Sequence, residues 1–78
     1  MQRTHKVKIL PQYFGFVERR IKNAEVRLDD RRYIAGDQLV LEEWNNGEYT
    51  GRFCVRTIRG VFPLDPIGFK NWVLLCLE

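Results

Sequence analysis

The order of hydrophobic and polar residues along the chain predicts a strand, then a helix, then further strands. Residues 6–9 alternate lysines with aliphatic residues, which is the pattern of a half-buried strand. Pro11 stands where the first turn of a helix would begin, so a helix is expected over about residues 11–21. Apolar residues at i, i+3 and i+7 predict the buried stripe of this helix, formed by Phe14, Val17 and Ile21.

The next predicted strand, residues 24–28, mixes apolar and charged residues. Side chains alternate between the two faces of a strand, so this segment should have one apolar and one charged face. The face directed to the core is expected to hold Ala24, Val26 and Leu28, and the opposite face Glu25 and Arg27.

Turn residues divide the rest of the chain into three more strands. Asn45-Asn46-Gly47 marks a tight hairpin, because Asn and Gly accept the positive φ that such turns require. Residues 60–71 contain two prolines and two glycines, which predicts a loop with one helical turn that could cover a binding cleft. The three strands are expected over residues 38–43, 49–59 and 72–77.

These elements define the expected fold class. Five strands and one helix, with connections too short for repeated βαβ crossovers, indicate an α+β, mostly β protein. We expect a mixed or mostly antiparallel sheet that curls into a small β-barrel with the helix at its flank. A chain of this length buries only about 60% of its unfolded surface. Residues 1–78 are therefore expected to form a single domain.

The charge distribution favours an anionic partner. The net charge is +3. Residues 1–35 hold nine Lys or Arg against four acids, whereas residues 36–78 hold four against six. Most of the basic residues are arginine, whose planar fork suits phosphate and stacking contacts. This pattern fits a nucleic-acid or phosphate ligand, and it also fits a solvated basic face that serves solubility alone.

The remaining composition excludes several classes of site. Cys54 and Cys76 lie in apolar strand patterns without a C-x-x-C motif or a neighbouring His, so we expect buried thiols and neither a metal nor a cofactor. No apolar run approaches the roughly 18 residues of a membrane span, and the N-terminal bases are not followed by a signal-peptide core. A cytoplasmic protein without membrane contact is expected.

One cluster of charges stands out at the start of the second predicted strand. Lys22, Glu25 and Arg27 bring two cations and a carboxylate to one end of the sheet. They could grip a phosphate and a base edge, or they could form a surface salt-bridge cluster worth about 0 to 1 kcal/mol per pair. Three further residues are candidates for the same ligand-binding surface: Lys8, Arg20 and His5.

Residues 20–27, read as Arg20-Ile21-Lys22-Asn23-Ala24-Glu25-Val26-Arg27, resemble the signature G-x-K-x-x-E-x-R of the ASCH domains, a branch of the PUA-like barrels. The opening segment 5–14 resembles the start of small bacterial and phage members of unknown function, and Gly36-Asp37 resembles their entry into the next strand. The resemblance implies a PUA-like barrel. The signature glycine is Arg20 here, so a side chain projects where the family keeps a bare backbone.

Together, charge and resemblance lead to an expected function. We expect RNA or a nucleotide-like ligand to bind in a cleft between the helix and the open end of the sheet, where these charges lie. Lys22 and Arg27 would contact phosphate or carbonyl groups, and Glu25 would accept a hydrogen bond from a base. The first alternative is a small amidohydrolase of acylated cytidine, implied by the resemblance, with Lys22 as the catalytic residue. The second is a protein-interaction module.

Overall fold

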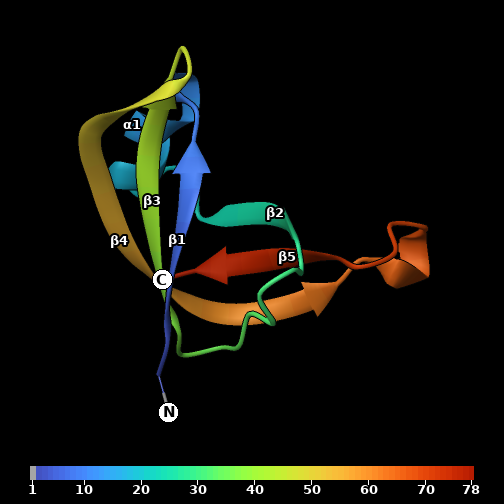
Figure 1. Cartoon of the computed structure of the whole chain (residues 1–78). Helices are drawn as coiled ribbons and strands as arrows, with labels where there is room; N and C mark the ends of the chain where they lie inside the picture. Colours follow the sequence, from blue (N-terminus) through green and yellow to red (C-terminus); the bar gives the residue numbers. More distant parts are fainter. Residues whose placement is uncertain (1) are drawn as a thin grey trace.

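Five strands form one mixed sheet in the computed structural model, which describes residues 2–78 (Figure 1). Along the sheet the strands follow the order β1-β3-β4-β5-β2, and a single α-helix lies beside β3. This arrangement confirms the α+β, mostly β class. The elements are β1 (Thr4–Ile9), α1 (Pro11–Glu18), β2 (Ala24–Leu28), β3 (Gln38–Asn45), β4 (Glu48–Pro63), the 3-10 helix η1 (Asp65–Ile67) and β5 (Trp72–Leu77).

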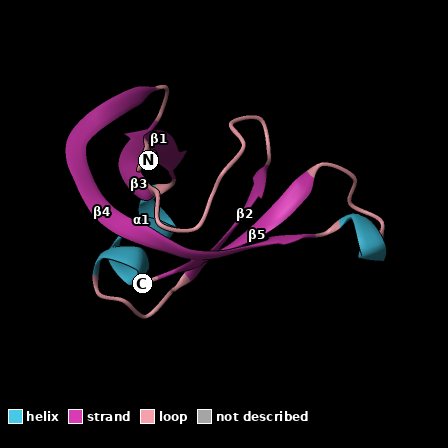
Figure 2. Cartoon of the chain, turned by 90° about the horizontal axis from the view of Figure 1, so that it is seen from below, coloured by secondary structure: helices cyan, strands magenta, loops and turns pink. Residues whose placement is uncertain are grey.

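The long strand β4 gives the sheet its curvature. Its first half pairs antiparallel with β3, and its second half pairs antiparallel with β5. The register shifts between Ile58 and Gly60, where one half passes into the other, and such irregularities increase the local bend of a strand. In Figure 2 the ribbon of β4 sweeps from the β1–β3 pair to the β5–β2 pair. The strand continues to Pro63, so the loop expected over 60–71 begins later and contains η1.

The sheet does not close into a barrel, which corrects the expected architecture. β1 pairs in parallel with β3, and β2 pairs with β5, but β1 and β2 are the two ends of the strand order. Two arginine side chains bridge the space instead. Arg27 donates to the carbonyl oxygen of Lys8 and Arg31 to that of Lys6. Guanidinium groups therefore occupy the position that a strand-to-strand ladder would have in a closed barrel.

The hydrophobic core lies between the curved sheet and α1. Phe14 and Val17 are the buried residues of the helix, as its apolar spacing predicts. The rest of the core comes mainly from alternate positions of the strands. Its members are Val7, Ile9, Phe14, Val17, Tyr33, Leu39, Leu41, Ile58, Val73, Leu75 and Leu77.

The helix ends at Glu18, one turn before the predicted end, and Ile21 is 65% exposed rather than buried. The reason lies in the backbone at Arg20, whose φ of 62° is in the left-handed region and stops the helix. The main-chain N–H groups of Ile21 and Lys22 then both donate to the carbonyl of Phe16. This turn brings Lys22 to the entrance of β2.

The two faces of β2 are reversed relative to the prediction. Glu25 is buried, whereas Val26 is 55% and Leu28 45% exposed. The pairing with β5 decides this orientation, because directly opposite residues in an antiparallel pair share a face. Glu25 lies opposite Leu75, which belongs to the core. The charged face of β2 is therefore the interior one.

Candidate functional site

The three residues of the predicted cluster meet around the carboxylate of Glu25. The Lys22 ammonium donates to Oε1 of Glu25 and to the carbonyl of Ala24. The Arg27 guanidinium donates to Oε2 of Glu25 at 3.1 Å. Both oxygens of Glu25 therefore accept a hydrogen bond. The residue is only 8% exposed, so the carboxylate is also largely shielded from solvent. The carboxylate neutralises two cations at the inner side of β2.

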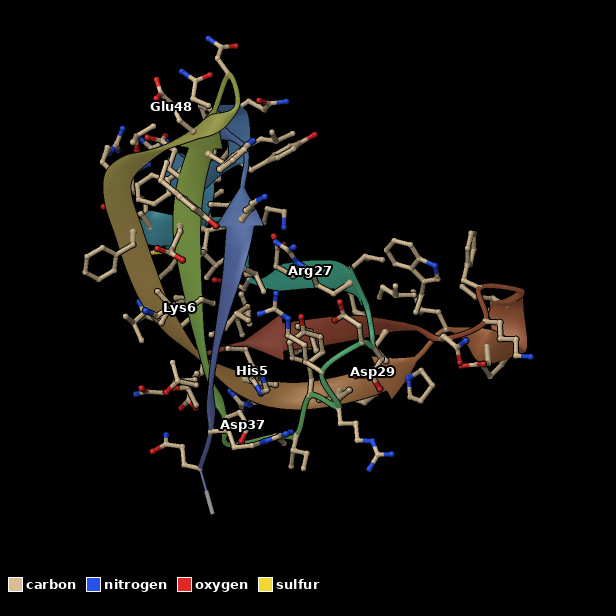
Figure 3. All side chains as sticks on the ribbon, viewed as in Figure 1. His5, Lys6, Arg27, Asp29, Asp37 and Glu48 are labelled. Carbon is tan, nitrogen blue, oxygen red and sulfur yellow. The ribbon has the colours of Figure 1, made fainter. Side chains whose placement is uncertain are left out.

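Arg27 connects this cluster on β2 to β1, the strand at the other end of the sheet. One of its Nη2 contacts is the Glu25 carboxylate, and another, at 2.5 Å, is the carbonyl oxygen of Lys8. Figure 3 shows its side chain between β2 and β1. Its Nε is buried and has no hydrogen-bond partner among residues 2–78. Arg31, from the turn after β2, reaches the carbonyl of Lys6 in the same way.

Arg56 fixes the turn from which β2 starts. It is 3% exposed, and its guanidinium donates to the carbonyls of Val17 and Glu78 at 2.8 and 2.9 Å and to Oδ1 of Asn23 at 2.7 Å. Burial lowers the pKa of Arg56 from its usual value, and the neighbouring charge of Arg20 adds to this effect. The sequence left the placement of this arginine open. The structure makes it the anchor between the helix end, the β2 turn and the end of β5.

A cavity of about 510 Å³ lies where the edge of β1 faces β2. Four of its lining residues are cationic and three are aromatic, and Asp30 is the single acid among them, 3.7 Å from the Nε of Arg31. The space is therefore basic with flat apolar walls. Its lining consists of Lys6, Val7, Lys8, Val26, Arg27, Leu28, Asp30, Arg31, Tyr33, Tyr49 and Trp72.

One of the cavity's lining residues, Tyr49, belongs to an aromatic pair at the β3–β4 hairpin. The rings of Trp44 and Tyr49 meet edge to face, with their centroids 4.8 Å apart, and the two residues face each other across the strands. The Lys8 ammonium lies over the Trp44 ring, 3.9 Å from its centroid. A cation over an aromatic face is held by the ring quadrupole, so Lys8 is oriented before any ligand arrives.

Behind the cavity, His5 belongs to a buried polar cluster. It is 6% exposed, and its Nε2 lies 2.8 Å from Oδ2 of Asp37 (Figure 3). That hydrogen bond is the main cause that lowers the pKa of Asp37, and the main-chain N–H groups of Arg3 and Ile34 add to it. The His5 ring packs edge to face on Tyr33, whose pKa is raised by burial.

The candidate residues thus occupy different places. Lys8 and Arg27 line the cavity, and Lys22 and Glu25 connect to it through Arg27. Arg20 lies on the exposed turn after α1, and His5 lies behind Tyr33. The candidates named from the sequence leave out five cationic or aromatic residues that line the cavity: Lys6, Arg31, Tyr33, Tyr49 and Trp72. The run of two acids and two arginines after β2 was the available signal for Arg31.

Other kinds of site leave little trace in the described part of the chain. Within residues 2–78 no group of three or more His, Cys, Asp or Glu side chains is arranged to hold a metal ion. Cys54 and Cys76 are free, half-buried thiols, and burial raises the pKa of Cys54. None of the helices in the same range has the length and apolar character needed to cross a membrane.

Comparisons with known proteins cover every element that lines the cavity. A family model described as "Domain of unknown function (DUF3850)" matches residues 4–77. The chain is also similar to a protein of Escherichia phage P2 that is described as "Uncharacterized 12.9 kDa protein in GpA 3'region". The two are 46% identical over 75 residues, which cover 96% of this chain and 68% of the phage protein.

Proposed function

The chain belongs to the DUF3850 family of small domains, with a relative in a phage, and we propose that it binds single-stranded RNA or a nucleotide-like ligand in the cavity between β1 and β2. The observation that supports this proposal is the lining of that cavity. Two lysines and two arginines line it together with three aromatic rings. Proteins that hold single strands combine these two features, a basic groove for the backbone and rings for the bases.

In this proposal the ligand is contacted by the cations whose N–H groups are not all used in hydrogen bonds within the protein. Lys6 and Lys8 point outward from the edge strand, and Arg31 uses one nitrogen on the carbonyl of Lys6. A guanidinium has five N–H donors, so Arg31 retains donors for a phosphate. Glu25 accepts from Lys22 and Arg27, and its role in our proposal is to hold Arg27 in place rather than to contact a base.

We also propose that the domain is an open relative of the PUA-like barrels and that it acts in the cytoplasm. The resemblance of residues 20–27 to the ASCH signature supports the first part. The signature has glycine where this chain has Arg20, and the φ of 62° there is a conformation that glycine adopts without strain. A left-handed backbone at Arg20 is compatible with the glycine of the signature, and this supports the proposal.

Hydrolysis of an acylated cytidine ranks second. That reaction would need Lys22 to attack as a free amine. In the structure the Lys22 ammonium instead donates to the carboxylate of Glu25 and to the carbonyl of Ala24. Both contacts would have to break before the nitrogen could act as a nucleophile. A binding role uses the cluster as it stands.

The experiment is fluorescence anisotropy with labelled single-stranded RNA of about eight nucleotides, measured at about 50 mM and about 200 mM salt. For single strands the slope of log K against log salt is about −0.7 per phosphate contact, so three cations predict a slope near −2 and a roughly 20-fold loss of affinity between the two salts. Lys6→Gln and Lys8→Gln should each reduce the slope by about 0.7. Arg19→Gln, the same charge change at the exposed residue that follows α1 and does not line the cavity, is the matched control.

Three results would contradict the proposal. Salt-independent binding, or no binding at either salt, would exclude a phosphate-contacting cavity. Equal effects of Lys6→Gln and Arg19→Gln would show that only net charge matters. Turnover of acylated cytidine that disappears in Lys22→Ala would support the hydrolase instead.

A further inference from the structure

The outer face of β2, β5 and the end of β4 is apolar and uncovered. Val26 lies opposite Leu74, and Leu74 lies opposite Phe62, so an apolar row crosses three strands on this face. The two ends of this row are exposed, Phe62 by 54% and Val26 by 55%. None of these three residues belongs to the core. Exposed apolar area that is continuous, rather than scattered, indicates a contact surface.

A second cavity, of about 360 Å³, lies on this face. Its walls are Val26, Leu64, Phe69 and Trp72, so two of its four lining residues are aromatic and none is polar. The loop that carries the rings is held by its own backbone. Leu64 N–H donates to Trp72 O at 2.8 Å, and Phe69 N–H donates to Leu64 O at 3.1 Å. The cavity is therefore formed before any ligand binds.

The apolar and the basic cavities are neighbours. Val26 and Trp72 line both of them, so a cavity with cationic walls and a cavity with apolar, largely aromatic walls adjoin at these two side chains. A nucleotide is divided in the same way, into a charged phosphate and a flat base. The basic cavity offers lysines and Arg31 to the first part, and the apolar cavity offers the rings of Phe69 and Trp72 to the second.

We infer that the apolar cavity holds one unpaired base of the RNA whose phosphates lie in the basic cavity. This inference rests on the proposed function and deepens it. Among the four lining residues the indole N–H of Trp72 is the one polar side-chain group, and the surface that faces the cavity is apolar, so the base is held by stacking and its identity is not read. A base inside a duplex is stacked between its neighbours and does not enter. The domain should thus select single strands over duplexes and accept all four bases similarly.

The test compares two ligands on the unmodified protein. One is a labelled RNA of about eight uridines, and the other has the same length and charge with abasic sugars at its central positions. Loss of one stacking contact weakens binding by about 5- to 150-fold. We expect the abasic RNA to bind wild type that much more weakly than the uridine RNA, while its salt slope stays the same.

Variants then locate the stacking contact. Phe69→Ala should lose the preference for the uridine RNA and bind both ligands as wild type binds the abasic one. Ile67→Ala is the matched control, since Ile67 is 68% exposed on η1 and does not line the cavity. It should retain the full difference between the two RNAs.

The failures of the two proposals are distinguishable. Equal, salt-dependent and lysine-dependent binding of both RNAs would overturn the base-stacking inference and leave the proposed function in place. No salt-dependent binding of either would overturn both. A dimer in sedimentation that Phe69→Ala dissociates without a change in RNA affinity would identify the apolar cavity as an interface between copies, and this too overturns the inference. Duplex RNA bound as tightly as the single strand would do the same.

Discussion

Replacing the carboxylate of Glu25 with an amide separates its structural role from a role in ligand contact. In Glu25→Gln the side chain keeps its size, but the negative charge between Lys22 and Arg27 disappears. If Glu25 serves to hold these two cations, the fold should lose stability and the affinity for RNA should change little. If Glu25 accepts a hydrogen bond from a base, affinity should fall instead.

The expected loss of stability follows from the contacts of Glu25. The carboxylate is 8% exposed and accepts hydrogen bonds from two charged groups, for which typical contributions are about 1.5 to 3 kcal/mol each. The side chains of Lys22 and Arg27 are 34% and 24% exposed, so solvent screening reduces each contribution to about 1 kcal/mol. We therefore expect Glu25→Gln to lower the free energy of unfolding by about 2 kcal/mol. In a domain of this size that corresponds to roughly 8 to 16 °C in Tm.

The measurement is urea unfolding followed by circular dichroism, together with RNA anisotropy at a temperature where the variant is folded. Glu48→Gln is the control, because Glu48 is exposed at the tip of the β3–β4 hairpin, away from Arg27 in Figure 3, and the charge change is the same. It should leave the free energy of unfolding within about 0.5 kcal/mol of wild type. Either substitution removes one negative charge, which has the same effect on the net charge as adding a positive one. At one Debye length, about 10 Å, from a phosphate, such a change raises RNA affinity at most about twofold.

Two results would refute this reasoning. A change in stability no larger than that of Glu48→Gln would mean that the contacts of Glu25 with Lys22 and Arg27 do not stabilise the fold. A tenfold or greater loss of RNA affinity in folded Glu25→Gln would mean that the carboxylate contacts the ligand directly.

Two further predictions concern stability away from the cavity. Arg20→Gly should raise the free energy of unfolding by about 0.5 to 1 kcal/mol in urea titrations, because it relieves the left-handed φ of 62°, whereas Arg19→Gly, at a φ of −85°, should lower it. The folded-state pKa of Asp37 is depressed below 3.8, so its stabilisation is present above that pH and is lost as the pH falls through the folded-state value. Wild type should therefore lose more stability than Asp37→Asn between about pH 6 and about pH 2, and an equal loss would contradict the role of the His5 contact.

Local sequence patterns predicted roughly where the strands lie, but they predicted the buried face of β1 and not that of β2. The alternation in β1 was sufficient because its lysines and aliphatic residues leave one possible buried face. In β2 the apolar residues Val26 and Leu28 suggested the wrong face. β5 is apolar on both of its sides, so its hydrophobic pattern could not show which of its residues would lie opposite Glu25. The pairing register, which is a long-range property, decided the orientation.

The candidate site was predictable only in part, for a related reason. The spacing of Lys22, Glu25 and Arg27 was enough to bring them together, because a strand and the turn before it are local structures. The cavity itself lies between β1 and β2. These are consecutive strands, separated in the chain by α1, and they do not pair with each other. Whether two edge strands meet is set by the curvature of β4 and by the bridging arginines, and neither has a local signature.

The arginine bridges connect the open sheet to the binding surface. Paired strands lie about 4.8 Å apart and leave no room between them. Here Arg27 and Arg31 reach from β2 and its following turn to the carbonyls of Lys8 and Lys6, so the strands stay apart by the length of a side chain. The same contacts cover carbonyl groups on an edge strand that would otherwise be free to pair with another chain. A closed barrel would satisfy those carbonyls equally well, but it would eliminate the basic groove. The two arginines that span the open edge of the sheet are therefore also part of the lining of the proposed RNA site.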